Sequence, residues 1–135
     1  MPKSSERQLI QERKEKAKKL AETFERAKQK LAELNEAKAY VLSAFHPGME
    51  ILHRAYGRGS ISEISGKSLT VQFESRGSMS LGILMCVING LITVEDDAFQ
   101  ERLNGYRTIL RQDNQINNAY EMAEKAFLPY AEFLE

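Results

Sequence analysis

The sequence predicts an α+β protein in which a small five-stranded antiparallel barrel lies between two long helices. Most of the eight glycines fall within residues 45–94, where short runs of alternating apolar residues are separated by glycine-containing turns. The segments on both sides are long, rich in charge and poor in glycine, as is typical of helices. We therefore expect three parts: a helical arm at residues 1–44, the barrel at residues 45–95, and a second helical arm at residues 96–135.

The first arm is predicted to be a single amphipathic helix. Residues 4–44 contain neither proline nor glycine, and strong helix formers dominate. A heptad pattern places apolar side chains at most positions of a narrow seam. The seam consists of Ile10, Ala17, Phe24, Leu31 and Lys38 in one position, and of Arg13, Leu20, Ala27, Leu34 and Val41 in the other. Because such a helix would be about 60 Å long, we expect it to pair with another helix; the alternative is a solvated arm ahead of residue 20.

Five short strands are predicted in the middle segment. The clearest is at residues 68–74, where Leu69, Val71 and Phe73 alternate with polar residues. An irregular alternation within residues 59–65 suggests a bulge in that strand. The expected strands are residues 49–54, 59–65, 68–74, 78–81 and 91–94, with a helical turn at 83–88.

The second arm is also predicted to be helical. Acidic residues at 95–97 suit a helix start, because they interact favourably with the free backbone N–H groups and the dipole there. Apolar residues then recur at steps of three and four to the end of the chain. The stretch QDNQINN at residues 112–118 predicts a bend or short break, and Pro129 predicts a kink or an end.

The two arms differ in charge. Residues 1–38 carry eleven basic and seven acidic side chains, whereas residues 95–135 carry four basic and nine acidic ones. Opposite charge favours association of the arms. Because the two ends of a small barrel lie close together, we expect the arms to pair as an antiparallel coiled coil. The pairing could form within one chain or between two chains of a homodimer.

Residues with catalytic or metal-binding chemistry are few. The two histidines, His46 and His53, lack the spacing of a helical zinc site. Cys86 lies in the apolar run at residues 83–88, so it is expected to be a buried small hydrophobe. We therefore expect no catalytic residues, no metal and no cofactor, and a protein that is not an enzyme.

Membrane insertion is not expected either. The longest apolar run has six residues, against the roughly 20 that a membrane-spanning helix needs. The opening sequence MPKSSERQLIQERKEK lacks the apolar core of a secretory signal. We expect a cytoplasmic protein.

The candidate binding residues combine an aromatic side chain with several cations near two turns of the barrel. They are His53, Arg54, Tyr56, Arg58 and Arg76. An aromatic ring beside cations can stack on a nucleic-acid base or on a partner side chain. The alternative is that Tyr56 packs on the barrel core and that the arginines are merely solvated.

The middle segment resembles a known family of small barrels. It is similar to the Tudor/SH3-like domain at the C-terminal end of UvrD/PcrA-type DNA helicases, and to the RNA-polymerase-interacting domain of CarD-like regulators and of the transcription-repair coupling factor. The resemblance covers residues 45–94 only. The matching residues are Pro47, Gly48, His53, Tyr56, Gly57, Gly59, Ile61, Ile64, Leu69, Val71 and Phe73.

The resemblance implies an SH3/Tudor-like barrel with a non-catalytic binding function. It implies a bacterial regulator or adaptor that docks through the barrel on transcription or DNA-repair machinery, with RNA polymerase or a repair factor as the protein partner. The alternative is direct binding of nucleic acid by the basic first helix and the barrel loops. The matching residues are markers of the fold, and no contact residue carries over from the family.

Overall fold

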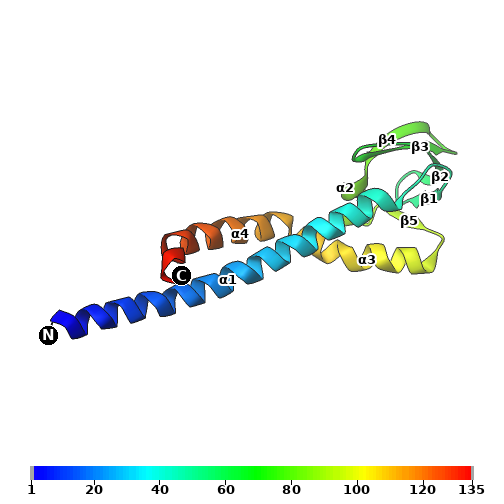
Figure 1. Ribbon diagram of the computed structural model, residues 1–135. Helices are drawn as coiled ribbons and strands as arrows, with labels where there is room; N and C mark the ends of the chain where they lie inside the picture. The colour runs from blue at the N-terminus through cyan, green and yellow to red at the C-terminus, as the bar shows by residue number, and fades with distance from the viewer. Residues whose placement is uncertain (1, 135) are drawn as a thin grey trace. The chain divides into compact units, whose positions relative to one another are not determined.

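The computed structural model (Figure 1) describes residues 2–134, with side chains described from residue 6 onward. Four α-helices and one 3₁₀ helix are present in this part of the chain. They are α1 (Pro2–Ala44), α2 (Ile83–Ile88), α3 (Asp97–Arg111), α4 (Asp113–Phe127) and the 3₁₀ helix η1 (Leu128–Leu134). The break between α3 and α4 lies at the start of the stretch where the sequence predicts a bend, and α4 ends just before Pro129.

The chain forms two compact units. Unit 1 comprises Met1–Glu33 together with Asp113–Glu135, and unit 2 comprises Leu34–Gln112. Unit 2 therefore contains the predicted β segment, the end of α1 and the whole of α3. Unit 1 contains the rest of α1 with α4 and η1.

Unit 2 is built on a five-stranded antiparallel sheet. The strands are β1 (Glu50–His53), β2 (Gly57–Ser65), β3 (Ser68–Phe73), β4 (Gly77–Gly82) and β5 (Ile92–Val94). Their order in the sheet is β4-β3-β2-β1-β5, so every neighbouring pair is antiparallel and β4 and β5 are the two edges. The α+β class with five antiparallel strands is confirmed. The closed barrel that the sequence predicts is not confirmed, because β4 and β5 do not pair.

The predicted irregularity in β2 is present as a shift of register. Ile61 pairs with Val71 in β3, but Glu63 pairs with Thr70, so one extra residue of β2 lies between the two pairs. A bulge of this kind bends its strand and increases the local twist. It lies within the longest strand, which pairs with both β1 and β3.

One face of the sheet is buried. Alternate residues of β3 (Leu69, Val71 and Phe73) are at most 4% exposed, as their period-two pattern predicts. Ile83 and Val87 of α2 are also buried, so this short helix contributes to the same core.

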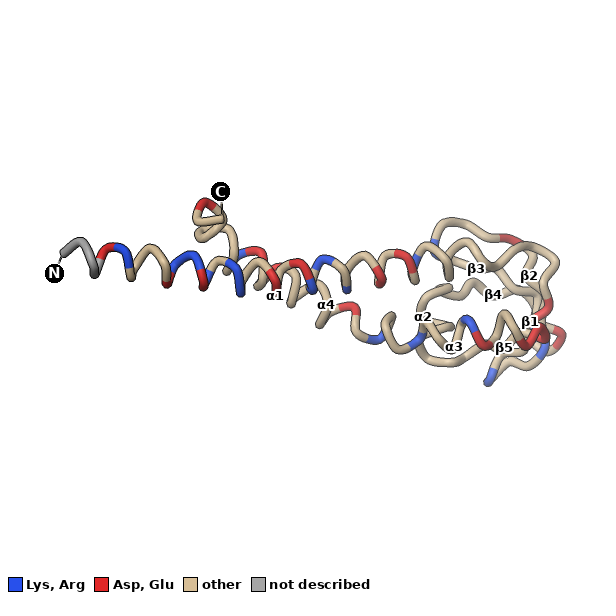
Figure 2. Tube along the Cα trace, turned by 60° about the horizontal axis from the view of Figure 1, so that its bottom comes forward, with Lys and Arg blue, Asp and Glu red and all other residues tan. Residues whose placement is uncertain are grey.

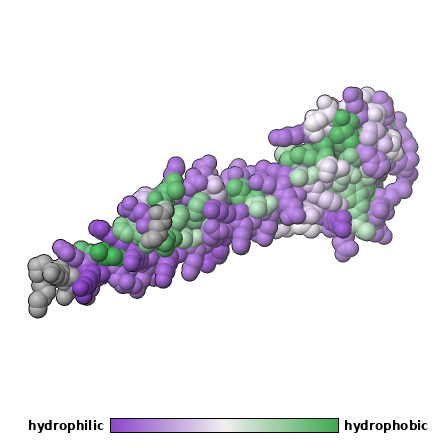
Figure 3. Space-filling model, viewed as in Figure 1, coloured by the Kyte–Doolittle hydropathy of each residue, from purple (hydrophilic) through white to green (hydrophobic). Residues whose placement is uncertain are grey.

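The core is less complete at the edge strand. Met79 and Leu81 of β4 pair with Val71 and Leu69 across the sheet, and both are partly exposed. Figure 3 shows hydrophobic atoms at the surface around α2 and β4, where Met85 is 58% exposed.

The end of α1 and the residue that follows it pack against α3 within unit 2. The rings of Tyr40 and Tyr106 have centroids 5.0 Å apart, and those of Phe45 and Phe99 are 5.4 Å apart. The helix α3 begins as the sequence predicts: Oδ1 of Asp96 accepts hydrogen bonds from the backbone N–H groups of Ala98 and Phe99, at 3.0 and 3.2 Å.

Unit 1 pairs the first part of α1 with α4 and η1. The ring of Phe24 lies 5.6 Å from both Tyr120 and Phe127, and Lys16 lies over the ring of Tyr130 at 4.9 Å. Since later residues of the C-terminal segment contact earlier residues of α1, the two run antiparallel. The coiled coil that the sequence predicts is not shown by these contacts.

The predicted seam of α1 is only partly buried. Ala17, Phe24, Leu34 and Val41 are buried, but Ile10 is 48% exposed, and all described side chains before Ala17 are exposed. Basic and acidic residues alternate along this helix (Figure 2), which is typical of a solvated face. No helix within residues 2–134 combines the length and the apolar character needed to cross a bilayer.

Candidate functional site

The first candidate residue, His53, is buried and is the last residue of β1, next to the turn that leads to β2. It is 6% exposed, and its Nδ1 atom accepts hydrogen bonds from the backbone N–H groups of Ala55 and Tyr56, at 3.0 and 3.2 Å. Burial lowers the pKa of His53 from its usual value of 6.5. The neutral ring, with Nδ1 as an acceptor, therefore holds the turn in shape, and its position supports a role in placing Tyr56.

Tyr56 is partly buried and packs against three other side chains. The rings of His53 and Tyr56 are stacked, and the guanidinium of Arg76 lies over the Tyr56 ring at 4.7 Å. Phe73 meets the same ring edge-on, with centroids 5.5 Å apart. Three of the five candidates (His53, Tyr56 and Arg76) thus form one cluster, and Arg76 would have to move before a base or partner side chain could stack on Tyr56.

Arg58 lies apart from this cluster and is paired with acids. Its Nη1 atom is 3.8 Å from Glu50 and 3.7 Å from Glu95. All three side chains are more than half exposed, so each ion pair contributes little to stability. The positive charge of Arg58 is nevertheless locally balanced by the two carboxylates.

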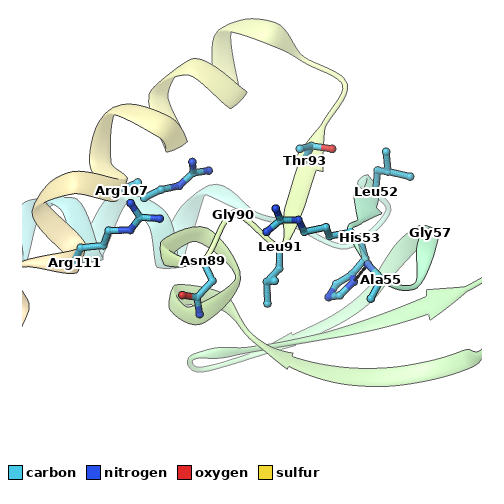
Figure 4. A pocket seen from close by; sticks show the side chains of 11 residues that line it. Leu52, His53, Ala55, Gly57, Asn89, Gly90, Leu91, Thr93, Arg107 and Arg111 are labelled. Atoms are coloured by element: carbon cyan, nitrogen blue, oxygen red, sulfur yellow. Dashed lines mark hydrogen bonds between the residues drawn. The ribbon is translucent and has the colours of Figure 1, made fainter.

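Arg54, the remaining candidate, lines an open groove with two arginines of α3. Figure 4 shows Arg107 and Arg111 extending from α3 towards the turn at Asn89 and Gly90. The groove has a volume of about 770 Å³ and lies between this turn, the end of β1 and α3. Sequence reasoning missed Arg107 and Arg111 because they lie some fifty residues from Arg54; their spacing of four on one helix face was the only local signal.

The edge strand β4 is a second candidate binding surface of unit 2, because one of its two edges is not paired with another strand within residues 2–134. Its sequence, GSMSLG, contains no charged residue and no proline. It pairs only with β3, and its second edge has no strand beside it in the described chain. An edge strand of this kind carries backbone N–H and C=O groups that another strand can use.

The described residues offer little for metal binding or thiol chemistry. No group of three or more His, Cys, Asp or Glu side chains that could hold a metal ion occurs among them. Cys86 is 2% exposed, as its apolar surroundings predict, and burial raises the pKa of its thiol.

Comparison of the chain with models of protein families and with curated proteins gives no match.

Proposed function

We propose that the chain is a non-catalytic binding module that docks on a protein partner by adding a strand of that partner to the β4 edge of its sheet. The observation that carries this proposal is the unprotected edge of β4. Natural sheets protect their edges with lysine, proline, bulges or covering segments. The six residues of β4 have neither a charge nor a proline, and β4 pairs with β3 in an unbroken register.

The apolar surface beside this edge supports the same mode of docking. Met79 and Leu81 continue the buried rows of Val71 and Leu69 but remain partly exposed, because no further strand covers them. Met85, in the neighbouring helix α2, is 58% exposed. A strand added to β4 would bury these side chains and satisfy its backbone groups at the same time.

The identity of the partner rests on the family resemblance of residues 45–94. That resemblance indicates transcription or DNA-repair machinery, with RNA polymerase as the first partner to test. By the same resemblance, we propose that the sheet of unit 2 is an SH3/Tudor-like barrel in an open form. The α1 and α4 segments of unit 1 are proposed to form an antiparallel coiled coil.

The proposal is tested by measuring binding of the whole chain to purified bacterial RNA polymerase with and without charges on the edge. Ser78 and Ser80 are exposed residues of β4, so lysines there should not disturb the core. We expect the Ser78→Lys/Ser80→Lys variant to lose at least tenfold in affinity, because lysine on an edge strand opposes strand addition.

Gln72→Lys is the matched control. Gln72 pairs with Ser78 across the sheet and is also exposed, but it lies in β3, which has strands on both sides. It should therefore leave the affinity within about twofold, since it adds charge without blocking the edge. Equal loss of affinity in the control and the β4 variant, or no binding by the unmodified chain, would contradict the proposal.

A further inference from the structure

We propose that the groove between α3 and the end of β1 binds the phosphate backbone of double-stranded nucleic acid. The groove is formed within unit 2, and it is separate from the β4 edge. Its basic side chains are Arg54, Arg107 and Arg111. The inference does not depend on the proposed function, because none of the residues that line the groove belongs to β4.

Two of the arginines are held in place by the end of α2. Nε of Arg107 donates a hydrogen bond to the carbonyl oxygen of Val87 at 3.0 Å, and Nε of Arg111 donates to that of Ile88 at 3.1 Å. Cations at a helix C-terminus stabilise its carbonyl groups, which is the purely structural interpretation of these contacts.

The hydrogen bonds leave most of the donor capacity of both side chains unused. A guanidinium has five N–H donors. Arg111 uses one of them, and Arg107 uses a second to reach Oδ1 of Asn104 at 3.0 Å. Since Nε is anchored, the remaining N–H groups are oriented in advance, which lowers the entropy cost of binding an anion.

The turn beside the arginines is shaped to accommodate a guanidinium. Gly90 has φ of +62°, and a Cβ atom added there would lie 3.3 Å from Nη2 and 3.4 Å from Cζ of Arg107. A side chain at this position would therefore be strained and would also push the guanidinium away. The glycine lets Arg107 lie directly over the turn, at the margin of the groove.

No negative charge balances these arginines locally. None of the lining residues is acidic. Within the described chain, Arg54, Arg107 and Arg111 form no ion pair with a carboxylate, in contrast to Arg58 with its two acids. Three unpaired guanidiniums along one open groove create a positive potential that a repeated anion can neutralise.

The lining also indicates which anion fits. No Phe, Tyr or Trp side chain of the described chain lines the groove, and the one ring there, His53, is buried and already stacked on Tyr56. The groove therefore offers no free platform for stacking an unpaired base. Arginine binds phosphate oxygens through paired N–H groups, and such backbone contacts carry no sequence information. These features favour sequence-independent contact with the phosphates of a duplex over recognition of bases or of a single strand.

The test is a fluorescence-anisotropy titration of the whole chain with a labelled mixed-sequence DNA duplex over a range of salt concentrations. We expect the Arg54→Gln variant to bind roughly three- to tenfold more weakly at low salt, with the slope of log K against log salt reduced by about 0.9. In the Arg107→Gln/Arg111→Gln variant two charges are removed, so the same slope should fall by about twice as much as in Arg54→Gln. Arg54 forms no side-chain hydrogen bond in the described chain, so its variant tests the groove even if the double variant is unstable.

Arg58→Gln is the matched control, because it removes one charge from the same sheet at a site already balanced by Glu50 and Glu95. Its affinity and salt slope should stay close to those of the unmodified chain. Absence of duplex binding at low salt, or binding that the Arg54 and Arg58 variants lower equally, would overturn the inference. So would competition by poly-glutamate that equals competition by DNA at the same charge concentration, since the groove would then be a site for acidic protein segments.

Discussion

The ring of Tyr56 is stacked on the ring of His53, with centroids 4.3 Å apart and planes inclined by 18°. The same histidine accepts the backbone N–H of Tyr56, so it fixes both the main chain and the side chain of that residue. His53 and Tyr56, which the sequence indicates as candidate binding residues, therefore also stabilise the turn between β1 and β2. The contribution of His53 to the free energy of unfolding can therefore be measured by replacing it.

Replacing His53 with leucine is expected to lower the free energy of unfolding by about 2 kcal/mol. The change leaves the N–H groups of Ala55 and Tyr56 without their acceptor in a partly buried turn. Urea unfolding followed by circular dichroism measures the difference. The exposed His46→Leu variant is the control and should change stability by less than about 0.5 kcal/mol; equal effects of the two variants would contradict the assigned role.

The stability of the chain should fall on acidification below about pH 6.5 through His53. Because its pKa is lower in the folded state than its usual 6.5, the unfolded chain binds more protons in this range, so stability rises with pH. The loss starts near pH 6.5 and is complete below the lowered folded-state pKa. Unfolding curves at several pH values give the free energy of unfolding. This free energy should show the loss due to His53 in the unmodified chain and in His46→Leu, and that loss should be absent in His53→Leu. If His53→Leu loses the same amount of stability below pH 6.5, the loss comes from other titratable groups and not from His53.

Gly59→Ala should destabilise unit 2 by about 2 kcal/mol through overpacking. A Cβ atom on Gly59 would lie 2.6 Å from Cγ1 of Val71 and 2.7 Å from Cδ1 of Phe73, both in the strand paired with β2. Gly105→Ala is the control, since Gly105 lies in α3 and, apart from the neighbouring backbone of its own helix, nothing lies within 4 Å of the added Cβ. That variant should gain about 0.5–1 kcal/mol from improved helix propensity. Thermal unfolding of both variants gives the comparison.

Phe24→Ala should loosen unit 1 while leaving unit 2 intact. The Phe24 ring is 7% exposed and contacts Tyr120 and Phe127, so its removal should cost up to about 3 kcal/mol of local stability. Hydrogen exchange should show faster exchange of the α4 amides and unchanged protection of β3. Leu9→Ala, at a half-exposed position of the same helix, should leave both unchanged.

Much of the element order could be predicted because its signals are local. The alternation of apolar residues at 68–74 predicts β3, and the acid at Asp96 predicts the start of α3 through a cap that two hydrogen bonds confirm. The glycines of two predicted turns, Gly66 and Gly77, have φ of +58° and +79°, values that other residues rarely adopt.

The features that depend on distant residues could not be predicted. Closure of the sheet depends on which strands meet, and the three-residue β5 pairs with β1 only. The pairing of Arg58 with Glu95 and the covering of Tyr56 by Arg76 join residues from different elements. The composition of the groove likewise depends on where α3 packs, since its residues are distributed over three segments of the chain.

The split of unit 1 between the two ends of the sequence has a consequence for biosynthesis. All 79 residues of unit 2, from Leu34 to Gln112, must be translated before the first residue of α4 is made. At about 5–20 residues per second, this takes roughly 4–16 s. During that interval Phe24 has neither Tyr120 nor Phe127 to pack against, so each nascent chain presents an uncovered apolar stripe to chaperones and to neighbouring nascent chains on the same messenger RNA.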